Sequence, residues 1–183
     1  FGSRNNISAF NNLFEMPTSS SWSNFLDSNI NVDSAHFIIY SGDSLVFFDQ
    51  SLNLYFSNDS HFSESNSINS DFHDFSLVDW NYNGSGNLDI ELDSVGDFVK
   101  SSLKWDISDL IGTLTDTTDT NLVRSFLINY SSTDSFLFSF YSRQATTNLS
   151  PQIVFYYRQF EGDSIDTNSY KYYASKDLTL IET

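Results

Sequence analysis

A short run of strict alternation constrains the fold of this chain more than any other feature. Three aliphatic residues alternate with three acidic ones, in the order Leu88, Asp89, Ile90, Glu91, Leu92, Asp93. Successive side chains of a β-strand point to opposite faces, so a half-buried strand places every aliphatic side chain inside and every carboxylate in water. The run therefore predicts a sheet with one face packed on a core and one wet face.

Further strand signals recur at the spacing expected of a β-sandwich. They lie at residues 36–40, 45–48, 52–56, 75–82, 103–107, 124–130, 136–141 and 152–157. Turn-forming residues separate them, as at 83–86, and we expect Ser108 and Asp109 to cap a short helical turn. We predict an all-β fold, an antiparallel jelly-roll-like β-sandwich with one short helix after residue 108.

The chain length of 183 residues fits a single domain of this kind. Residues 1–32 show no sustained period of 2 or 3.6, so we expect an N-terminal arm without a regular element. Residues 33–183 form the predicted sandwich domain. Within it, residues 158–183 are a C-terminal tail with enough apolar residues for one added hairpin or an edge strand. Because the first residue is Phe1 rather than Met, we expect a processed product or an excerpt of a longer chain.

Charge and composition exclude several classes of function. The formal net charge is −16, from 24 acidic against 8 basic residues, which disfavours binding to nucleic acid or to anionic lipid. The sequence has no cysteine, so disulfides, thiolate metal sites and cysteine nucleophiles are excluded. No apolar run is long enough to span a bilayer, and we predict no membrane insertion.

The C-terminal half resembles the DNRLRE family of β-sandwich modules, which are jelly-roll domains related to certain carbohydrate-binding modules. The similarity covers roughly residues 87–157 and lies in four short segments whose order and spacing match: 105–111, 126–128, 140–143 and 151–157. A weaker similarity covers residues 36–56. Similar domains occur in structural proteins of tailed bacteriophages of marine bacteria. The resemblance implies a sandwich fold.

This sequence departs from the family pattern at its front. The Arg-rich segment that gives the family its name is not visible, and Arg4 is the only basic residue before Lys100. We therefore carry over the fold and no ligand site.

The residues offer little chemistry for catalysis. Alternate strand residues such as Asp89 and Glu91 are spaced like glycosidase carboxylates, but three on one exposed face share one environment, which gives no means of separating their pKa values. The three histidines form no ligand motif. A Thr- and Asp-rich loop contains Asp116, Asp119 and Asn121, which are candidates for a structural calcium site because oxygen-rich loops bind calcium. We predict no other cofactor and no enzymatic activity.

Aromatic residues are the more informative feature, at 17% of the chain. Tryptophan and tyrosine rings stack on sugars and are also enriched in protein interfaces. The candidate carbohydrate or interface residues are Trp22, Trp80, Tyr82 and Tyr141. For Trp80 a place in the core is the alternative.

Two functions remain open. The first is a structural or interaction module of a virion or an extracellular surface assembly, such as a decoration, neck or tail component that binds other protein subunits as an oligomer or lattice. The second is a carbohydrate-binding module of a secreted or surface polysaccharide-processing protein, with a polysaccharide as its partner. Both place the protein on a virion surface or outside the cell.

Overall fold

The computed structural model describes most of the chain. The described residues are 9–17, 25, 27–41, 52–58, 80–92, 94–96, 98–118, 122–131, 140–146 and 148–182. The strand signals at 45–48 and 75–79, most of that at 136–141, and the candidate residues Trp22, Asp119 and Asn121 lie outside these residues.

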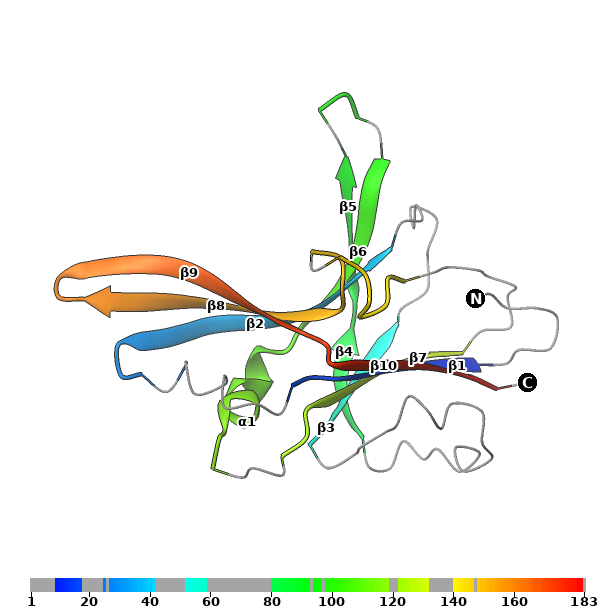
Figure 1. Ribbon diagram of the computed structural model, residues 1–183, viewed down its shortest axis with the longest axis horizontal. Coiled ribbons are helices and arrows are strands. Elements are labelled where there is room, and N and C mark those ends of the chain that lie inside the picture. The colour runs from blue at the N-terminus through cyan, green and yellow to red at the C-terminus, as the bar shows by residue number, and fades with distance from the viewer. Residues whose placement is uncertain are drawn as a thin grey trace.

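The described residues form two five-stranded antiparallel sheets packed face to face (Figure 1). The first sheet has the order β10-β1-β7-β3-β4, with β10 (Lys176–Glu182), β1 (Ala9–Glu15), β7 (Ser125–Ser131), β3 (Asn53–Ser57) and β4 (Asn81–Ser85). The second has the order β5-β6-β2-β8-β9, with β5 (Asn87–Leu92), β6 (Phe98–Asp106), β2 (Ile30–Ser41), β8 (Gln152–Glu161) and β9 (Ser164–Tyr173). The predicted β-sandwich is confirmed, and the chain passes repeatedly between its two sheets.

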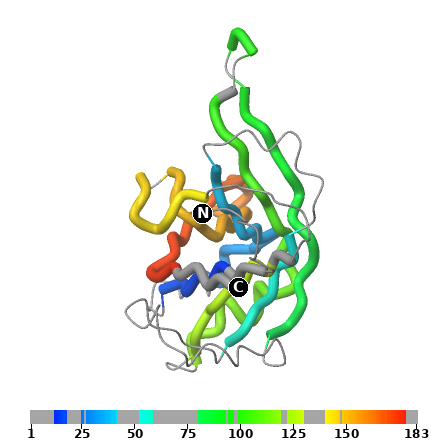
Figure 2. The backbone as a smooth tube through the Cα atoms, turned by 90° about the vertical axis from the view of Figure 1, so that its right-hand side faces the viewer, coloured from blue at the N-terminus to red at the C-terminus, as the bar shows by residue number. Residues whose placement is uncertain are grey.

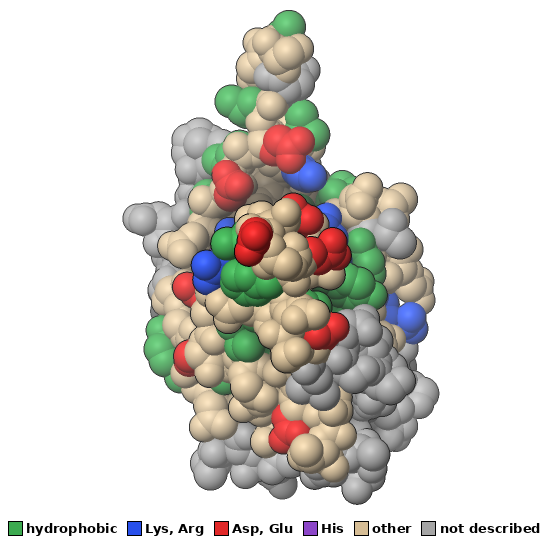
Figure 3. Space-filling view, turned by 90° about the vertical axis from the view of Figure 1, so that its left-hand side faces the viewer, with side chains coloured by type: hydrophobic (Ala, Val, Ile, Leu, Met, Phe, Trp, Pro, Cys, Tyr) green, Lys and Arg blue, Asp and Glu red, His purple; other side chains and the backbone are tan. Residues whose placement is uncertain are grey.

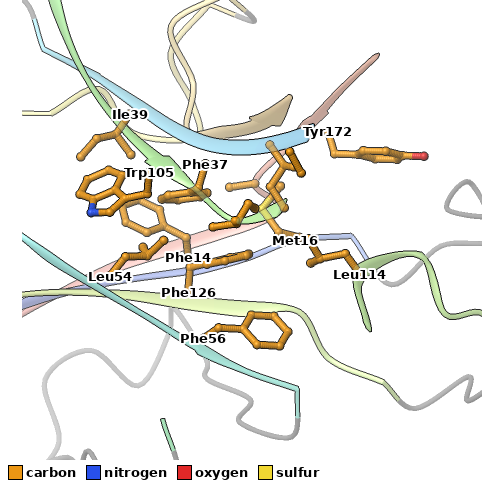
Figure 4. Packing of buried hydrophobic residues seen from close by; sticks show 14 of the residues in the cluster. Phe14, Met16, Phe37, Ile39, Leu54, Phe56, Trp105, Leu114, Phe126 and Tyr172 are labelled. Carbon is orange, nitrogen blue, oxygen red and sulfur yellow. The ribbon is translucent and has the colours of Figure 1, made fainter. Parts of the chain in front are cut away.

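Aromatic rings from both sheets meet in the core (Figure 4). Phe37 of β2 stacks on Phe126 of β7 with ring centroids 4.8 Å apart and an interplanar angle of 12°. Trp105 of β6 is 1% exposed, and its indole Nε1 donates a hydrogen bond to the carbonyl oxygen of Leu52 at 3.0 Å. These contacts hold the two sheets together, because each ring buries a large apolar surface between them.

The strand predicted at residues 103–107 is confirmed as part of β6, and its side chains alternate between the core and the outward face. Leu103, Trp105 and Ile107 are buried, and the intervening Lys104 and Asp106 point outward. The inward residues join the core cluster. The period of two therefore identifies the core-facing side chains of β6.

The short helix after residue 108 is also confirmed, as a 3₁₀ turn (Ser108–Leu110) followed by α1 (Ile111–Thr115). The predicted cap is wrong. Asp106, which precedes the turn, accepts hydrogen bonds from the backbone N–H of Ser108 at 3.0 Å and from its hydroxyl. The capping carboxylate lies upstream of Ser108 because the turn begins at that residue itself.

Residues 1–32 contain more regular structure than predicted. Strand β1 lies inside the first sheet, between β10 and β7, and β2 begins at Ile30. The neighbours Leu13 and Phe14 point to opposite faces and are 2% and 4% exposed. A strand buried on both faces shows no apolar–polar alternation, and this is why the period-two criterion missed β1.

The turn predicted at residues 83–86 is wrong, because Asn83, Gly84 and Ser85 belong to β4. The pairing of β4 with β3 shifts between Asn53 and Tyr55, whose partners are Ser85 and Tyr82. Asn83 and Gly84 thus occupy a bulge, and Gly84 has a φ of 108°, which suits glycine. The turn-like composition marks a bulge rather than a chain reversal.

The C-terminal residues supply both an added hairpin and an edge strand, where the sequence predicts one or the other. Strand β8 continues to Glu161 and turns at Gly162 into β9, while β10 forms an edge of the first sheet. Pro151 precedes a strand in the interior of the sheet, because β8 lies between β2 and β9. Pro151 is tolerated because it immediately precedes the strand, where its missing N–H interrupts no ladder inside β8.

Candidate interaction surfaces

The β5–β6 hairpin stands out from the body of the sandwich (Figures 1 and 2). Its outer end carries three exposed apolar side chains, Leu92, Val95 and Val99, which are 56%, 79% and 48% exposed. We call these three residues the apolar tip. Green hydrophobic atoms are visible along this projection in the space-filling view (Figure 3).

The exposure of Leu92 corrects the prediction that it faces the core. Leu88 and Ile90 of the same strand are half-buried, and Leu88 packs against the core cluster. Strand β5 is the edge strand of its sheet, and it continues past the body of the sandwich (Figure 1). The alternation therefore persists in the sequence where there is no longer a core to cover the aliphatic side.

The carboxylates of this strand lie on the wet face, as predicted for the two that are described. Asp89 and Glu91 are exposed, and Glu91 pairs with Lys100 of β6 at 3.1 Å. Asp93 lies outside the described residues. The two carboxylates share one open face, which gives no basis for separate acid and base roles.

The outward face of the second sheet carries a cluster of tyrosine and lysine residues. Lys100 lies over the ring of Tyr40 at 5.0 Å, and Lys104 lies over the ring of Tyr156 at 5.8 Å. His36 meets Tyr156 edge-on, with centroids 5.6 Å apart. These contacts come from three neighbouring strands, so their proximity follows from sheet order rather than from sequence spacing.

Two buried polar atoms on this face have no hydrogen-bond partner among the described residues. Gln152 is fully buried, and its Nε2 donates to the hydroxyl of Tyr40 at 2.9 Å, while its Oε1 meets no donor in the described part of the chain. The same holds, within the described residues, for Nδ1 of His36. Burial raises the pKa of Tyr40 and lowers the pKa of His36, and Lys104 lowers the pKa of His36 further. Desolvation and electrostatic repulsion by Lys104 thus both favour the neutral form of His36.

The candidate aromatic residues lie in different places. Trp80, which directly precedes β4, is buried at 8% exposure, whereas Tyr82 on β4 is 59% exposed. Tyr141 is half-buried, and its N–H donates to the carbonyl oxygen of Tyr40 at 2.9 Å, beside the second sheet. The structure therefore does not unite Tyr82 and Tyr141 in one site, since they adjoin different sheets.

Tyr82 has an aromatic neighbour that lies opposite it across the strand pair. The rings of Tyr82 and Tyr55 meet edge-on, with centroids 5.5 Å apart. Ser85 lies 3.4 Å from the Tyr82 hydroxyl and donates to Oδ1 of Asn53 at 3.3 Å. We call these four residues, Asn53, Tyr55, Tyr82 and Ser85, the tyrosine patch. An exposed ring beside amide and hydroxyl groups has the composition of a sugar-binding surface.

Asp116 is the one described residue of the calcium candidates. Its carboxylate accepts hydrogen bonds from the backbone N–H and the hydroxyl of Thr118, at 2.8 and 2.7 Å, and these bonds lower the pKa of Asp116. Among the described residues, no three histidine or acidic side chains are grouped so that they could hold a metal ion. In the part of the chain that is described, Asp116 closes a local turn.

Sequence reasoning missed the structural role of Arg124, which is 3% exposed. Its guanidinium donates to the carbonyl oxygens of Leu114 at 2.6 Å and of Asp116 at 2.5 Å. Arg124 therefore fastens the end of α1 to the start of β7. Burial lowers the pKa of Arg124, and Asp116 opposes that effect. No sequence motif announces such a contact, because the acceptors are backbone groups.

The chain matches no family model, no curated protein and no solved structure. Within the described ranges, no helix is both long and apolar enough to cross a membrane. The surfaces described above are thus the basis for a functional proposal.

Proposed function

We propose that the protein is a non-catalytic structural module of a virion or an extracellular surface assembly, and that it binds a neighbouring subunit through the β5–β6 hairpin. The observation that carries this proposal is the apolar tip. Leu92, Val95 and Val99 are exposed at the end of a projecting hairpin, away from the core of the sandwich.

Binding of the apolar tip to a partner would remove its side chains from water. Apolar surface removed from water contributes about 25 cal/mol per Å², so three aliphatic side chains on a projection favour insertion into an apolar groove of a partner. Exposed apolar groups that cluster together mark interaction sites more often than single scattered ones. The net charge of −16 keeps the isolated chain soluble despite this tip, and favours a basic rim on the partner.

The resemblance to the DNRLRE family supports the same proposal. The segment at 105–111 resembles the family's strand-to-short-helix step, and here it spans the end of β6, the 3₁₀ turn and the start of α1. We propose further that the chain is a member of that family and serves as a decoration, neck or tail component. A sandwich fold alone serves many unrelated functions.

A carbohydrate-binding module remains the second candidate, and the tyrosine patch favours it. Tyr82 offers an exposed ring, and Asn53 and Ser85 offer hydrogen-bonding groups next to it. Stacking of a pyranose on Tyr82 with polar contacts at its rim would use each of these groups.

One pair of variants separates the two functions. The double variant Leu92→Ser/Val95→Ser removes two of the three aliphatic side chains of the apolar tip, and Tyr82→Ser removes the exposed ring of the tyrosine patch. We expect the tip variant to fail to co-sediment with the native particles or surface layer, while Tyr82→Ser assembles normally. Normal assembly of the tip variant would contradict the structural proposal. Retention of wild type on one polysaccharide in affinity gels, lost in Tyr82→Ser, would favour the second candidate.

A further inference from the structure

Strand β9 forms a long exposed edge of the second sheet. It spans ten residues, and every residue from Ser164 to Lys171 is exposed. Its pairing with β8 runs from Gln152↔Tyr173 to Glu161↔Ser164 without a register shift. Among the described strands, none pairs with its other side. The β8–β9 hairpin extends away from the sandwich body at the left of Figure 1.

One hydrogen bond next to the C-terminal end of β9 shows which of its residues bond to β8. The N–H of Ala174 donates to the carbonyl oxygen of Pro151 at 2.9 Å, so this pair is of the hydrogen-bonded type. In an antiparallel ladder the two types of pair alternate. Because the register has no shift, even-numbered residues of β9 bond to β8. The odd-numbered residues direct their backbone N–H and C=O groups away from β8, and they are Ile165, Thr167, Ser169, Lys171 and Tyr173.

We infer that this edge pairs with β9 of a second copy of the chain, antiparallel, about a two-fold axis near Asn168. The pairing places Thr167 opposite Ser169 of the second copy and Ile165 opposite its Lys171. All four residues present free backbone groups, so each copy donates and accepts across the junction. The second sheets of the two copies, five strands each, then form one continuous sheet.

The edge is compatible with two-fold symmetric self-pairing. A two-fold axis perpendicular to a sheet leaves each side chain on the same face of the sheet. Residues that face each other across the axis must therefore both be odd-numbered or both be even-numbered. Ile165, Thr167, Ser169 and Lys171 are evenly placed about Asn168 and meet this condition. Asp166 and Lys171 are the charged residues of the strand, and neither lies opposite a like charge in this register.

The geometry of the hairpin leaves room for the second copy. In an antiparallel pair of projecting hairpins, the two sandwich bodies lie at opposite ends of the shared strands. The edge also lacks most of the devices that keep sheet edges apart, since β9 contains no proline and no bulge. Pairing would cover Ile165, which is 59% exposed, and Tyr170, which is 40% exposed.

Two charge variants test this inference. Thr167→Glu/Ser169→Glu and Thr167→Lys/Ser169→Lys each place like charges in two directly opposed pairs across the junction. Within one copy, Thr167 lies opposite Arg158 of β8, whose Nη2 is held by Asp33 at 2.6 Å, so both signs of charge are tolerable in the monomer. Gln144→Glu/Thr146→Glu and Gln144→Lys/Thr146→Lys, at two exposed positions outside both hairpins, are the matched controls.

Analytical ultracentrifugation of the full chain measures the outcome. We expect wild type and both controls to dimerise, and each double variant to dissociate about tenfold more readily. An equal mixture of the Glu and Lys variants should recover the dimer, because every opposed pair is then of opposite charge. This recovery also shows that both variants are folded.

Two results would overturn the inference. One is a wild-type monomer at concentrations up to about 1 mM, which excludes any useful affinity. The other is a wild-type dimer that both double variants preserve unchanged, since the dimer would then use another surface. Either result leaves the apolar tip of the β5–β6 hairpin untouched, because that surface is tested separately with Leu92→Ser/Val95→Ser.

Discussion

The sandwich body and the projecting hairpins use the same local pattern for different ends. In the body, Phe37 and Trp105 alternate with outward residues; Phe37 stacks on Phe126 of the opposite sheet, and Trp105 is buried beside Phe37. In the β5–β6 hairpin, Leu92 continues the same alternation but is 56% exposed. The difference teaches that alternation reports how a strand divides its side chains, and that burial depends on whether a second sheet lies opposite.

The two regions should therefore differ in what substitutions cost. Stability comes from the body, where apolar area is removed from water and close packing is required. The hairpin ends contribute little to stability, so their apolar residues are free to serve binding.

The largest effect is expected in the body. Trp105→Ala removes a fully buried indole and leaves the Leu52 carbonyl without its 3.0 Å hydrogen bond. We expect a loss of about 3–5 kcal/mol in the free energy of unfolding, measured by urea denaturation. A loss below about 1 kcal/mol would mean that the two sheets do not share this core.

A smaller loss of stability is expected at Gly86, where the backbone packs closely against the indole ring of Trp105. A Cβ added at Gly86 would lie 2.7 Å from Cε2 of Trp105, so Gly86→Ala should cost about 1–3 kcal/mol by overpacking. The matched control is Gly112→Ala in α1, where the added Cβ meets nothing within 4 Å. The control should be neutral or stabilising by up to about 1 kcal/mol, because alanine favours helix. Equal losses in the two variants would contradict this packing.

The outward face of the second sheet should respond to pH. Burial, with help from Lys104, holds the pKa of His36 below its ordinary 6.5, whereas Asp106 acts in the opposite direction. The His36 side chain therefore binds a proton more readily in the unfolded chain than in the folded one. The stability that depends on neutral His36 is fully present above pH 6.5 and is lost as the pH falls below it.

Urea midpoints measured between pH 7 and pH 5 test this dependence. The midpoint of the wild type should fall as the pH falls, and His36→Gln should show a shallower decline. Identical slopes in the two proteins would show that His36 does not carry the effect.

The smallest effect is expected at the apolar tip. Val95 is 79% exposed, so Val95→Ser should change the free energy of unfolding by less than about 0.5 kcal/mol. A loss above about 1 kcal/mol would show that the tip packs in the isolated chain, and would remove the contrast between hairpin and body.

Local patterns predicted those elements whose two faces differ. Leu103 and Trp105 belong to a strand that the sequence predicts because polar residues separate them, and the short helix is predicted from the residues after Ile107. Strand β1 was missed because Leu13 and Phe14 are both buried, which erases the alternation. Gly84 was assigned to a turn because composition does not distinguish a turn from a bulge.

The candidate surfaces depend on contacts that no local pattern encodes. Tyr82 was identified from its residue type, but its neighbour Tyr55 is fixed by the pairing of β3 with β4. The contact of Gln152 with Tyr40 joins residues 112 positions apart. Likewise, the free edge of β9 follows from sheet order, which sequence periodicity does not determine.

Site-specific cross-linking tests the central claim, that a projecting hairpin binds a neighbouring subunit, most directly. Because the chain has no cysteine, Val95→Cys provides a unique position for a photo-reactive label, and Asp109→Cys, on the exposed 3₁₀ turn, provides the control. In the native assembly, we predict that position 95 forms adducts with one defined neighbouring subunit and that position 109 forms few. Equal labelling from the two positions, or none from position 95 in an intact assembly, would contradict the account.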